Sequence, residues 1–195
     1  MFPAFEGTRM ITTVPGNHDI GLGDGISLPR LNRFKDYFTD ENTTSQIFET
    51  CGFQLILLDT PSLLNTQTPE IHDPPAQFLD TIPDPRPDLP RILFTHIPLY
   101  RPADTPCGAY RESPRPIFYG AGYQYQNTLP PALSTRILDA LWPVSAVFTG
   151  DDHDYCVVEH EMEGRRESVP EYTVKSFSMA MVPAPPIPPS PGRWY

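Results

Sequence analysis

Three apolar runs in this chain each end directly in polar side chains of the kind that bind metals. The first ends at Gly16-Asn17-His18-Asp19, the second, Ile92–Thr95, at His96, and the third, Val144–Thr149, at Gly150-Asp151-Asp152-His153-Asp154. Short apolar runs rich in β-branched residues predict buried strands. Open α/β sheets place their sites at the carboxyl ends of such strands. The sequence therefore predicts an α/β sheet with one site where these three strands end.

The distribution of proline excludes a simple helical bundle. The chain has 195 residues and 26 prolines, and the prolines crowd into Pro83–Pro90, Pro98–Pro116 and Pro183–Pro191. We therefore expect long loops, including an irregular lid over Pro98–Thr128. Periodicity predicts helices and strands between them, which together favour a layered α/β sandwich. One helix is expected to begin at Leu28, a second to span Ala76–Ile82 and a third to begin at Pro130. The expected strands are Met10–Val14, Gln46–Glu49, Phe53–Asp59, Arg91–Thr95, Val144–Thr149, Tyr155–Glu161 and Glu171–Phe177.

The charge and the cysteines narrow the functional classes. A net charge of −10 repels nucleic-acid phosphate, so we expect no nucleic-acid partner. A small phosphorylated substrate stays compatible, because bound cations can supply local positive charge. The three cysteines form no Cys-x-x-Cys pair, so a thiolate zinc site is not expected. One disulfide with one free thiol is left open, and Cys156 is interpreted as a small core residue.

The side chains of the first cluster suit a hard divalent cation and acid–base chemistry. Gly16 is expected to allow a turn that a β-carbon would forbid. Asn17 offers an amide oxygen, His18 an imidazole and Asp19 a carboxylate. The alternative is an Asn-containing turn with a solvated His-Asp pair. His96 alone is weaker, since a histidine at a strand end is more often a structural hydrogen-bond donor.

The third cluster is the strongest of the three. It places three carboxylates and one imidazole between Asp151 and Asp154. Such groups repel one another unless something positive lies among them. A solvated turn is the alternative explanation.

The order of these clusters resembles that of the calcineurin-like metallophosphoesterases. Four further segments are similar to the fungal branch that remodels GPI anchors, and the likeness extends over residues 9–181. The resemblance implies a four-layer αββα sandwich, a location in the lumen of the endoplasmic reticulum, and removal of ethanolamine phosphate from GPI mannose. It also implies membrane association through segments that this chain lacks. The four segments are Val14–Ile26, Leu57–Leu63, Phe148–Cys156 and Tyr172–Met181.

The resemblance also implies a role for each site residue. Two divalent metals, most simply manganese, would bind the phosphate: Asn17 and His96 would hold one metal and His153 the other. Asp151 stands where the family has the first His of a Gly-His-x-His motif, and its carboxylate would bind manganese there. His18 would act as the catalytic acid or transition-state stabiliser, with Asp19 orienting it.

The chain departs from the family pattern upstream of Gly16. The Asp-x-His and Gly-Asp-x-x-Asp motifs are not among the preceding residues. We therefore expect a sandwich that is incomplete at its N-terminus, ligands for only part of the metal site, and slow or no turnover of phosphodiesters. The expected organisation is a partial domain over residues 1–181 and a disordered Pro-rich tail over residues 182–195.

Two other functions stay open at the level of sequence. The core motifs alone also suit a general phosphomonoesterase or a nucleotide phosphodiesterase. The missing motifs favour a catalytically inactive remnant that binds a partner. No targeting segment or membrane span is expected, because the most apolar run, Phe53–Leu58, falls far short of the roughly 20 residues that cross a bilayer.

Overall fold

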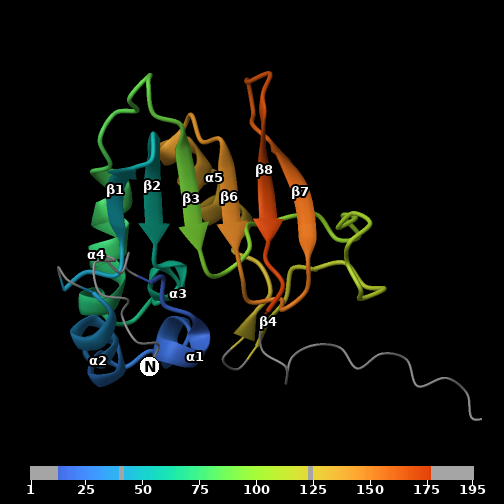
Figure 1. The fold of residues 1–195 in the computed structure, drawn as a ribbon. Coiled ribbons are helices and arrows are strands. Elements are labelled where there is room, and N and C mark those ends of the chain that lie inside the picture. The colour runs from blue at the N-terminus through green and yellow to red at the C-terminus, as the bar shows by residue number, and fades with distance from the viewer. Residues whose placement is uncertain (1–12, 40–41, 123–124, 177–195) are drawn as a thin grey trace, which may run out of the picture.

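A six-stranded mixed sheet forms the centre of the molecule (Figure 1). The computed structural model describes residues 13–39, 42–122 and 125–176. The strand order in the sheet is β1-β2-β3-β6-β8-β7. The six strands are β1 Gln46–Thr50, β2 Phe53–Leu58, β3 Arg91–Thr95, β6 Ala146–Thr149, β7 Cys156–Glu161 and β8 Ser168–Thr173.

The four central strands run parallel and end at the same edge of the sheet. Strand β2 pairs in parallel with β3, β3 with β6, and β6 with β8, whereas the edge strands β1 and β7 are antiparallel to their neighbours. The polar residues that follow β3 and β6 are therefore brought together, as the sequence predicts. The short helices α1 (Asn17–Ile20) and α3 (Thr60–Leu63) lie at this edge (Figure 1).

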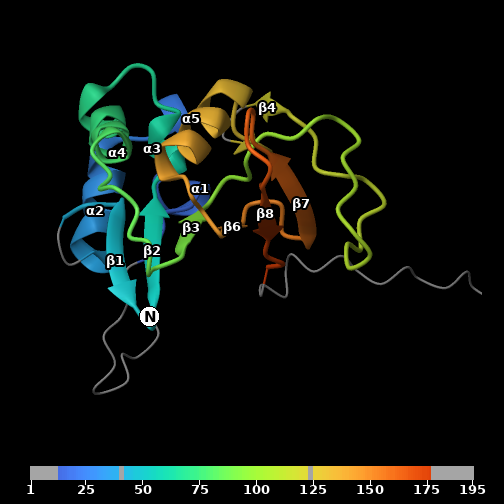
Figure 2. The ribbon, with the colours of Figure 1, turned by 90° about the horizontal axis from the view of Figure 1, so that it is seen from above.

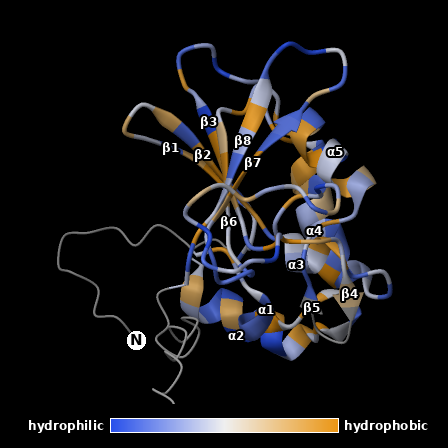
Figure 3. Cartoon of the chain, turned by 90° about the vertical axis from the view of Figure 1, so that its right-hand side faces the viewer, coloured by the Kyte–Doolittle hydropathy of each residue, from blue (hydrophilic) through white to orange (hydrophobic). Residues whose placement is uncertain are grey.

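Helices cover one face of the sheet. Seen from above, α3, α4 (Pro69–Asp80) and α5 (Pro131–Leu141) lie on the same side, while α2 (Leu28–Phe38) packs beside α1 (Figure 2). Hydrophobic residues concentrate in the strands and the loops beyond them are mostly hydrophilic (Figure 3). The main core between sheet and helices includes Ile56, Leu58, Leu79, Leu93, Ile137, Leu141, Val147 and Val169.

The opposite face of the sheet carries a row of aromatic side chains. Phe94, Phe148 and Tyr172 are cross-strand partners on β3, β6 and β8. Their rings stack in sequence, with centroids 5.3 Å apart in each pair. These rings are half-buried, unlike the residues that alternate with them and face the helices. Stacked cross-strand aromatics stabilise the register of the parallel strands.

A buried ionic network joins the long loop after β3 to strand β8. Glu171 accepts a hydrogen bond from Arg101 at 2.6 Å and lies 2.6 Å from Nε2 of His160. Thr149 and the amide of Leu99 also donate to this carboxylate. The charge of buried Glu171 is thus paired and hydrogen-bonded, which is the condition under which a buried carboxylate is tolerated.

Most predicted elements are confirmed, with two boundaries corrected. Helix α4 begins at Pro69 instead of Ala76, although it contains Pro74 and Pro75. Ile71, on the earlier turns, is buried in a second cluster with Ile20 and Leu31, and this packing outweighs the low helix propensity of proline. Strand β8 spans Ser168–Thr173 instead of beginning at Glu171. The sequence prediction missed the first half of this strand because it contains Pro170, and proline usually interrupts strands.

The long loop after β3 is irregular, as predicted, apart from one small hairpin. Its strands are β4 (Ala121–Gly122) and β5 (Tyr125–Gln126). The strand expected over Met10–Val14 lies mainly outside the described residues, and Thr13 and Val14 are not part of a strand. The Pro-rich tail from Val182 also lies outside them.

The described residues form one large sheet with helices on one face. This mixed α/β arrangement is consistent with a metallophosphoesterase-like fold, and the four-layer sandwich stays a prediction. Within the same residues, no helix is long and apolar enough to span a bilayer.

Candidate metal and phosphoester site

Residues from three separate parts of the sequence meet at His96. The side-chain oxygen Oδ1 of Asn17 lies 3.1 Å from His96 Nε2. Oδ1 of Asp151 lies 3.2 Å from the same nitrogen. The His96 and Asp151 side chains are largely buried. The structure thus brings together three of the predicted ligands at the carboxyl ends of β3 and β6.

A glycine is needed at position 16 because the His96 ring packs against it, and not because of the backbone conformation of Gly16. Its φ of −102° and ψ of 172° describe extended backbone that any residue adopts, so the expected reason for a glycine is wrong. A β-carbon here would lie 2.9 Å from Cε1 of His96. Only glycine lets the imidazole pack directly against this turn.

The backbone of His96 is fixed from both sides. Thr95 shares a hydrogen bond of 2.6 Å with Thr60 on α3, and Thr60 accepts one from the amide of Ile97. The carbonyl of His96 accepts the amide of Gly150 at 2.9 Å. The end of β3 is therefore tied to both α3 and the loop after β6, which limits the positions open to the imidazole.

The loop after β6 holds two residues in the left-handed region. Asp151 has a φ of 64° and His153 a φ of 65°. This conformation is uncommon outside glycine, and it persists where the surrounding structure holds it. The loop therefore needs anchors, and the two neighbouring carboxylates supply them.

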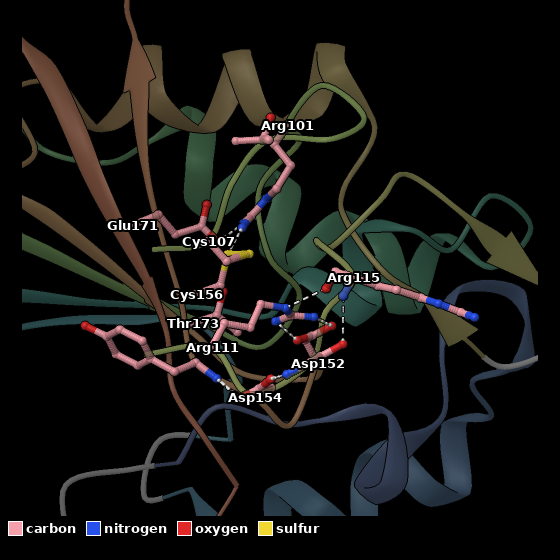
Figure 4. Close-up of a disulfide and its surroundings, with 12 residues drawn as sticks. Arg101, Cys107, Arg111, Arg115, Asp152, Asp154, Cys156, Glu171 and Thr173 are labelled. Carbon is pink, nitrogen blue, oxygen red and sulfur yellow. Dashed lines mark hydrogen bonds and ion pairs between the residues drawn. A yellow bond between two sulfur atoms is a disulfide. The ribbon is translucent and has the colours of Figure 1, made fainter. Parts of the chain in front are cut away.

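Asp152 and Asp154 bind the long loop that follows β3 (Figure 4). Arg111 donates to Asp152 through two nitrogens, at 2.6 and 3.4 Å, and its side chain is 8% exposed. Asp154 accepts the amides of Ser113 at 2.8 Å and Glu112 at 3.0 Å. Burial opposes ionisation of Asp154, yet these amides, that of Tyr155 and nearby Arg111 hold its pKa below the ordinary value.

These contacts explain how the carboxylate cluster is tolerated. The sequence predicted that something positive lies among Asp151, Asp152 and Asp154, with a solvated turn as the alternative. In the structure, Arg111 and backbone amides offset the charges of Asp152 and Asp154. Asp151 alone of the three faces His96, so it is the carboxylate of this loop that is placed to bind a metal.

A disulfide joins the long loop after β3 to the first residue of β7. Cys107 and Cys156 are bonded and lie 49 residues apart in sequence. Cys156 is fully buried in a cluster with Ile117 and Val158, as expected of a small core residue, and it also forms the disulfide. The open alternative of one disulfide and one free thiol is confirmed, with Cys51 free and exposed. Buried Arg101 donates to Cys156 Sγ at 3.2 Å (Figure 4).

Three predicted site residues, His153, His18 and Asp19, are not brought to His96. The imidazole of His153 makes no hydrogen bond or ion pair with any described residue, although its carbonyl accepts the amide of Ser176. His18 is exposed on α1 and lines a separate cavity with Asp19. Asp19 accepts the amide of Gly16 at 2.8 Å, which caps the turn. The roles assigned to these three residues remain predictions.

The donors at His96 suit one divalent cation. Within the described residues, no three His, Cys, Asp or Glu side chains form a metal-binding group, and the third donor at this site is the amide oxygen of Asn17. Two ligands of one octahedral cation, each about 2.1 Å from it, lie about 3 Å apart. The separations at His96 match that spacing. Asn17, His96 and Asp151 thus fit one cation, while a second is not accounted for by the described donors.

Sequence reasoning missed the residues that hold the loop. Arg111 stands in a stretch with no periodicity, so nothing in the sequence singles it out. Cys107 offered a partial signal, since a pair of cysteines was available for a disulfide. Because Glu171 is a charged residue in a strand, the sequence predicts that it is exposed. Its burial is explained only by its ion pair with Arg101.

The chain is similar to several curated proteins. It is 39% identical over 184 residues to Cell division control protein 1 of Saccharomyces cerevisiae, and the aligned region covers 93% of this chain and 37% of that protein. It is 30% identical over 175 residues to Metallophosphoesterase 1 homolog of Caenorhabditis elegans, covering 89% and 47% respectively. It is 26% identical over 189 residues to Metallophosphoesterase 1 of Ailuropoda melanoleuca, covering 86% and 45%.

The chain spans less than half the length of each of these three relatives. No family model matches the chain, and no solved structure matches it. The named relatives and the cluster at His96 together support a relative of the metallophosphoesterases, and suggest a phosphoester hydrolase.

Proposed function

We propose that this chain is part of a metal-dependent phosphodiester hydrolase that removes ethanolamine phosphate from the mannose of GPI anchors. The observation that carries the proposal is the meeting of Asn17, His96 and Asp151 at the ends of two parallel strands. A divalent cation bound there supplies Lewis-acid polarisation of the phosphate and offsets its charge. In the proposal, manganese is the cation.

The protein groups around this cluster divide the work. Asn17, His96 and Asp151 would hold the cation. His18, one residue after Asn17 and exposed to solvent, would donate a proton to the leaving alkoxide. Asp19 fixes the turn that carries His18 by accepting the amide of Gly16. Asp19 thus orients His18 through the backbone.

The loop after β6 supports the GPI-remodelling branch. Its segment Gly150–Cys156 carries the residues that resemble that branch, and nearly all of them have a structural role. Asp152 binds Arg111, Asp154 binds the opposite loop, and Cys156 forms the disulfide. The disulfide also supports an oxidising compartment such as the lumen of the endoplasmic reticulum.

Hydrolysis of matched esters tests the proposal. The purified chain with Mn²⁺ is offered a mannoside that carries ethanolamine phosphate, a thymidine phosphodiester and p-nitrophenyl phosphate. We expect slow release of ethanolamine phosphate, lost in His96→Ala and kept in His72→Ala, a half-exposed histidine on α4. Faster cleavage of the thymidine diester or the monoester would favour the general phosphoesterase. No cleavage of any ester would favour a partner-binding role.

A further inference from the structure

A small cavity lies beside His18, outside the cluster of Asn17, His96 and Asp151. Its volume is about 260 Å³. Helix α1 supplies His18 and Asp19 to its wall, and α2 supplies the rest: Arg33, Phe34, Tyr37 and Phe38. The two helices pack against each other at the edge where the sheet strands end (Figure 1). The cavity therefore adjoins the residue that would protonate the leaving group.

One wall of this cavity is aromatic and open to solvent. Tyr37 is 66% exposed and Phe38 is 44% exposed. Phe38 is held against buried Phe34, with ring centroids 5.1 Å apart. An exposed aromatic ring that lines a cavity offers a flat apolar face to a ligand. The apolar face of a saturated ring can stack on it.

The polar groups of the cavity are available for hydrogen bonds. Arg33 is exposed and makes no hydrogen bond or ion pair with any described residue. Asp19 uses Oδ2 to accept the Gly16 amide, which leaves Oδ1. A guanidinium can only donate hydrogen bonds, and a carboxylate can only accept them. A hydroxyl does both, so a ligand with several hydroxyls satisfies Arg33 and Asp19 together.

We propose that this cavity binds a single hydroxylated sugar ring, the leaving-group side of the phosphodiester. The ring would stack on Tyr37 and Phe38, and its hydroxyls would bind Arg33 and Asp19. The volume of about 260 Å³ is close to the lower end of the roughly 300–1,000 Å³ of sites for drug-sized ligands, which suits a single ring. The assignment of this ring to the leaving group rests on the proposed function, because His18 defines that side.

Binding measured without metal tests this cavity separately from catalysis. The probe is methyl α-mannopyranoside carrying ethanolamine phosphate, followed by ligand NMR, with thymidine as the competing ring. We expect Tyr37→Ala and Arg33→Gln each to weaken mannoside binding about 3- to 10-fold, as loss of one stacking or hydrogen-bond contact predicts. Tyr37→Phe keeps the ring and should bind like the parent chain.

Two controls separate the outcomes. Arg30 is exposed one turn earlier on α2, outside the cavity, so Arg30→Gln should not change binding. His96→Ala should abolish turnover and leave mannoside binding intact. Mannoside binding that depends on Tyr37 and Arg33, with no hydrolysis, would remove the proposed function and keep the sugar site. Undetectable mannoside binding, binding unchanged in both variants, or tighter binding of thymidine would overturn the sugar site.

Discussion

Nε2 of His96 lies 3.1 Å from Oδ1 of Asn17, a residue 79 positions earlier in the chain. Asn17 begins a single turn of helix, and His96 follows a central strand. Asp151, after the next parallel strand, approaches the same nitrogen. An imidazole nitrogen facing two oxygens is either a hydrogen-bond donor shared between them or, with the oxygens, a ligand to one cation. The proposed metal site requires that this nitrogen be a ligand.

The contact of Gly16 with His96 gives the first prediction. Gly16→Ala would place a methyl group 2.9 Å from Cε1 of His96, which forces the ring to move. We expect Mn²⁺ affinity to fall about 10-fold or more, the effect typical of disturbing the support of a metal ligand. Titration calorimetry measures the affinity.

Gly150 provides the matched control. A β-carbon there would lie 3.5 Å from Nδ1 of the same ring, which is ordinary contact. Gly150→Ala should therefore keep the affinity. Equal losses in the two variants would mean that the contact of Gly16 with His96 does not position the ring.

The ion pair between Arg111 and Asp152 gives the second prediction. Arg111→Gln leaves Asp152 without its guanidinium, so we expect a loss of about 1.5–3 kcal/mol in the free energy of unfolding, measured in urea. Because the pair holds the loop of Asp151, Mn²⁺ affinity should also fall. Arg86 pairs with Glu49 and Asp88 on the surface, and Arg86→Gln should cost less than about 1 kcal/mol. Similar costs in both variants would show that the pair at Asp152 is no anchor.

The third prediction concerns the disulfide. Cys107 and Cys156 close a loop across 49 positions, for which the chain-entropy model gives about 4 kcal/mol. Replacing both with serine should lower the free energy of unfolding on that order. Cys51→Ser should change nothing, because that thiol is free and exposed. If reducing agent leaves the unfolding curve of the parent chain unmoved, the disulfide does not form in solution.

The fourth prediction follows from a buried carboxyl group. Burial raises the pKa of Asp59, against the hydrogen bonds that it accepts from Ser62 and Thr44. The folded chain therefore binds more protons than the unfolded chain above the ordinary pKa of 3.8, and Asp59 lowers stability as pH rises through its raised pKa. Asp59→Asn should remove this slope from urea unfolding at pH values above 3.8.

Asp24 supplies a control of opposite sign. Its exposed carboxylate accepts the Thr66 amide, which lowers its pKa. This contribution to stability is present above the ordinary value and is lost as pH falls through the lowered pKa. Asp24→Asn should therefore leave the slope assigned to Asp59 unchanged. A slope that persists in Asp59→Asn must come from another group.

The sheet and the meeting of the strand ends could be predicted from the sequence. Apolar runs such as Phe53–Leu58 and Arg91–Thr95 have the length and composition of buried strands, and the observed strands follow them closely. Helix α2 was predicted from the spacing of Leu31, Phe34 and Phe38. The first two are buried, while Phe38 stays exposed at the cavity.

The rest depends on contacts between distant residues. Arg111 and Asp152 are 41 positions apart, and no local pattern pairs them. The reason for Gly16 lies in the imidazole of His96 and not in its own backbone. The beginning of β8 was placed too late because of Pro170, whereas pairing with β7 from Ser168 onward and burial of Val169 extend the strand past that proline.

The most direct measurement is the response of His96 to Mn²⁺, followed by NMR of the histidine ring nitrogens. We predict that Mn²⁺ broadens the resonances of His96 and Asn17 well before those of His72, which lies on α4. His96→Ala should weaken Mn²⁺ binding about 10-fold or more. If Nε2 of His96 instead keeps its proton between Asn17 and Asp151 and its signals stay sharp, His96 is a structural donor and the proposed metal site is wrong.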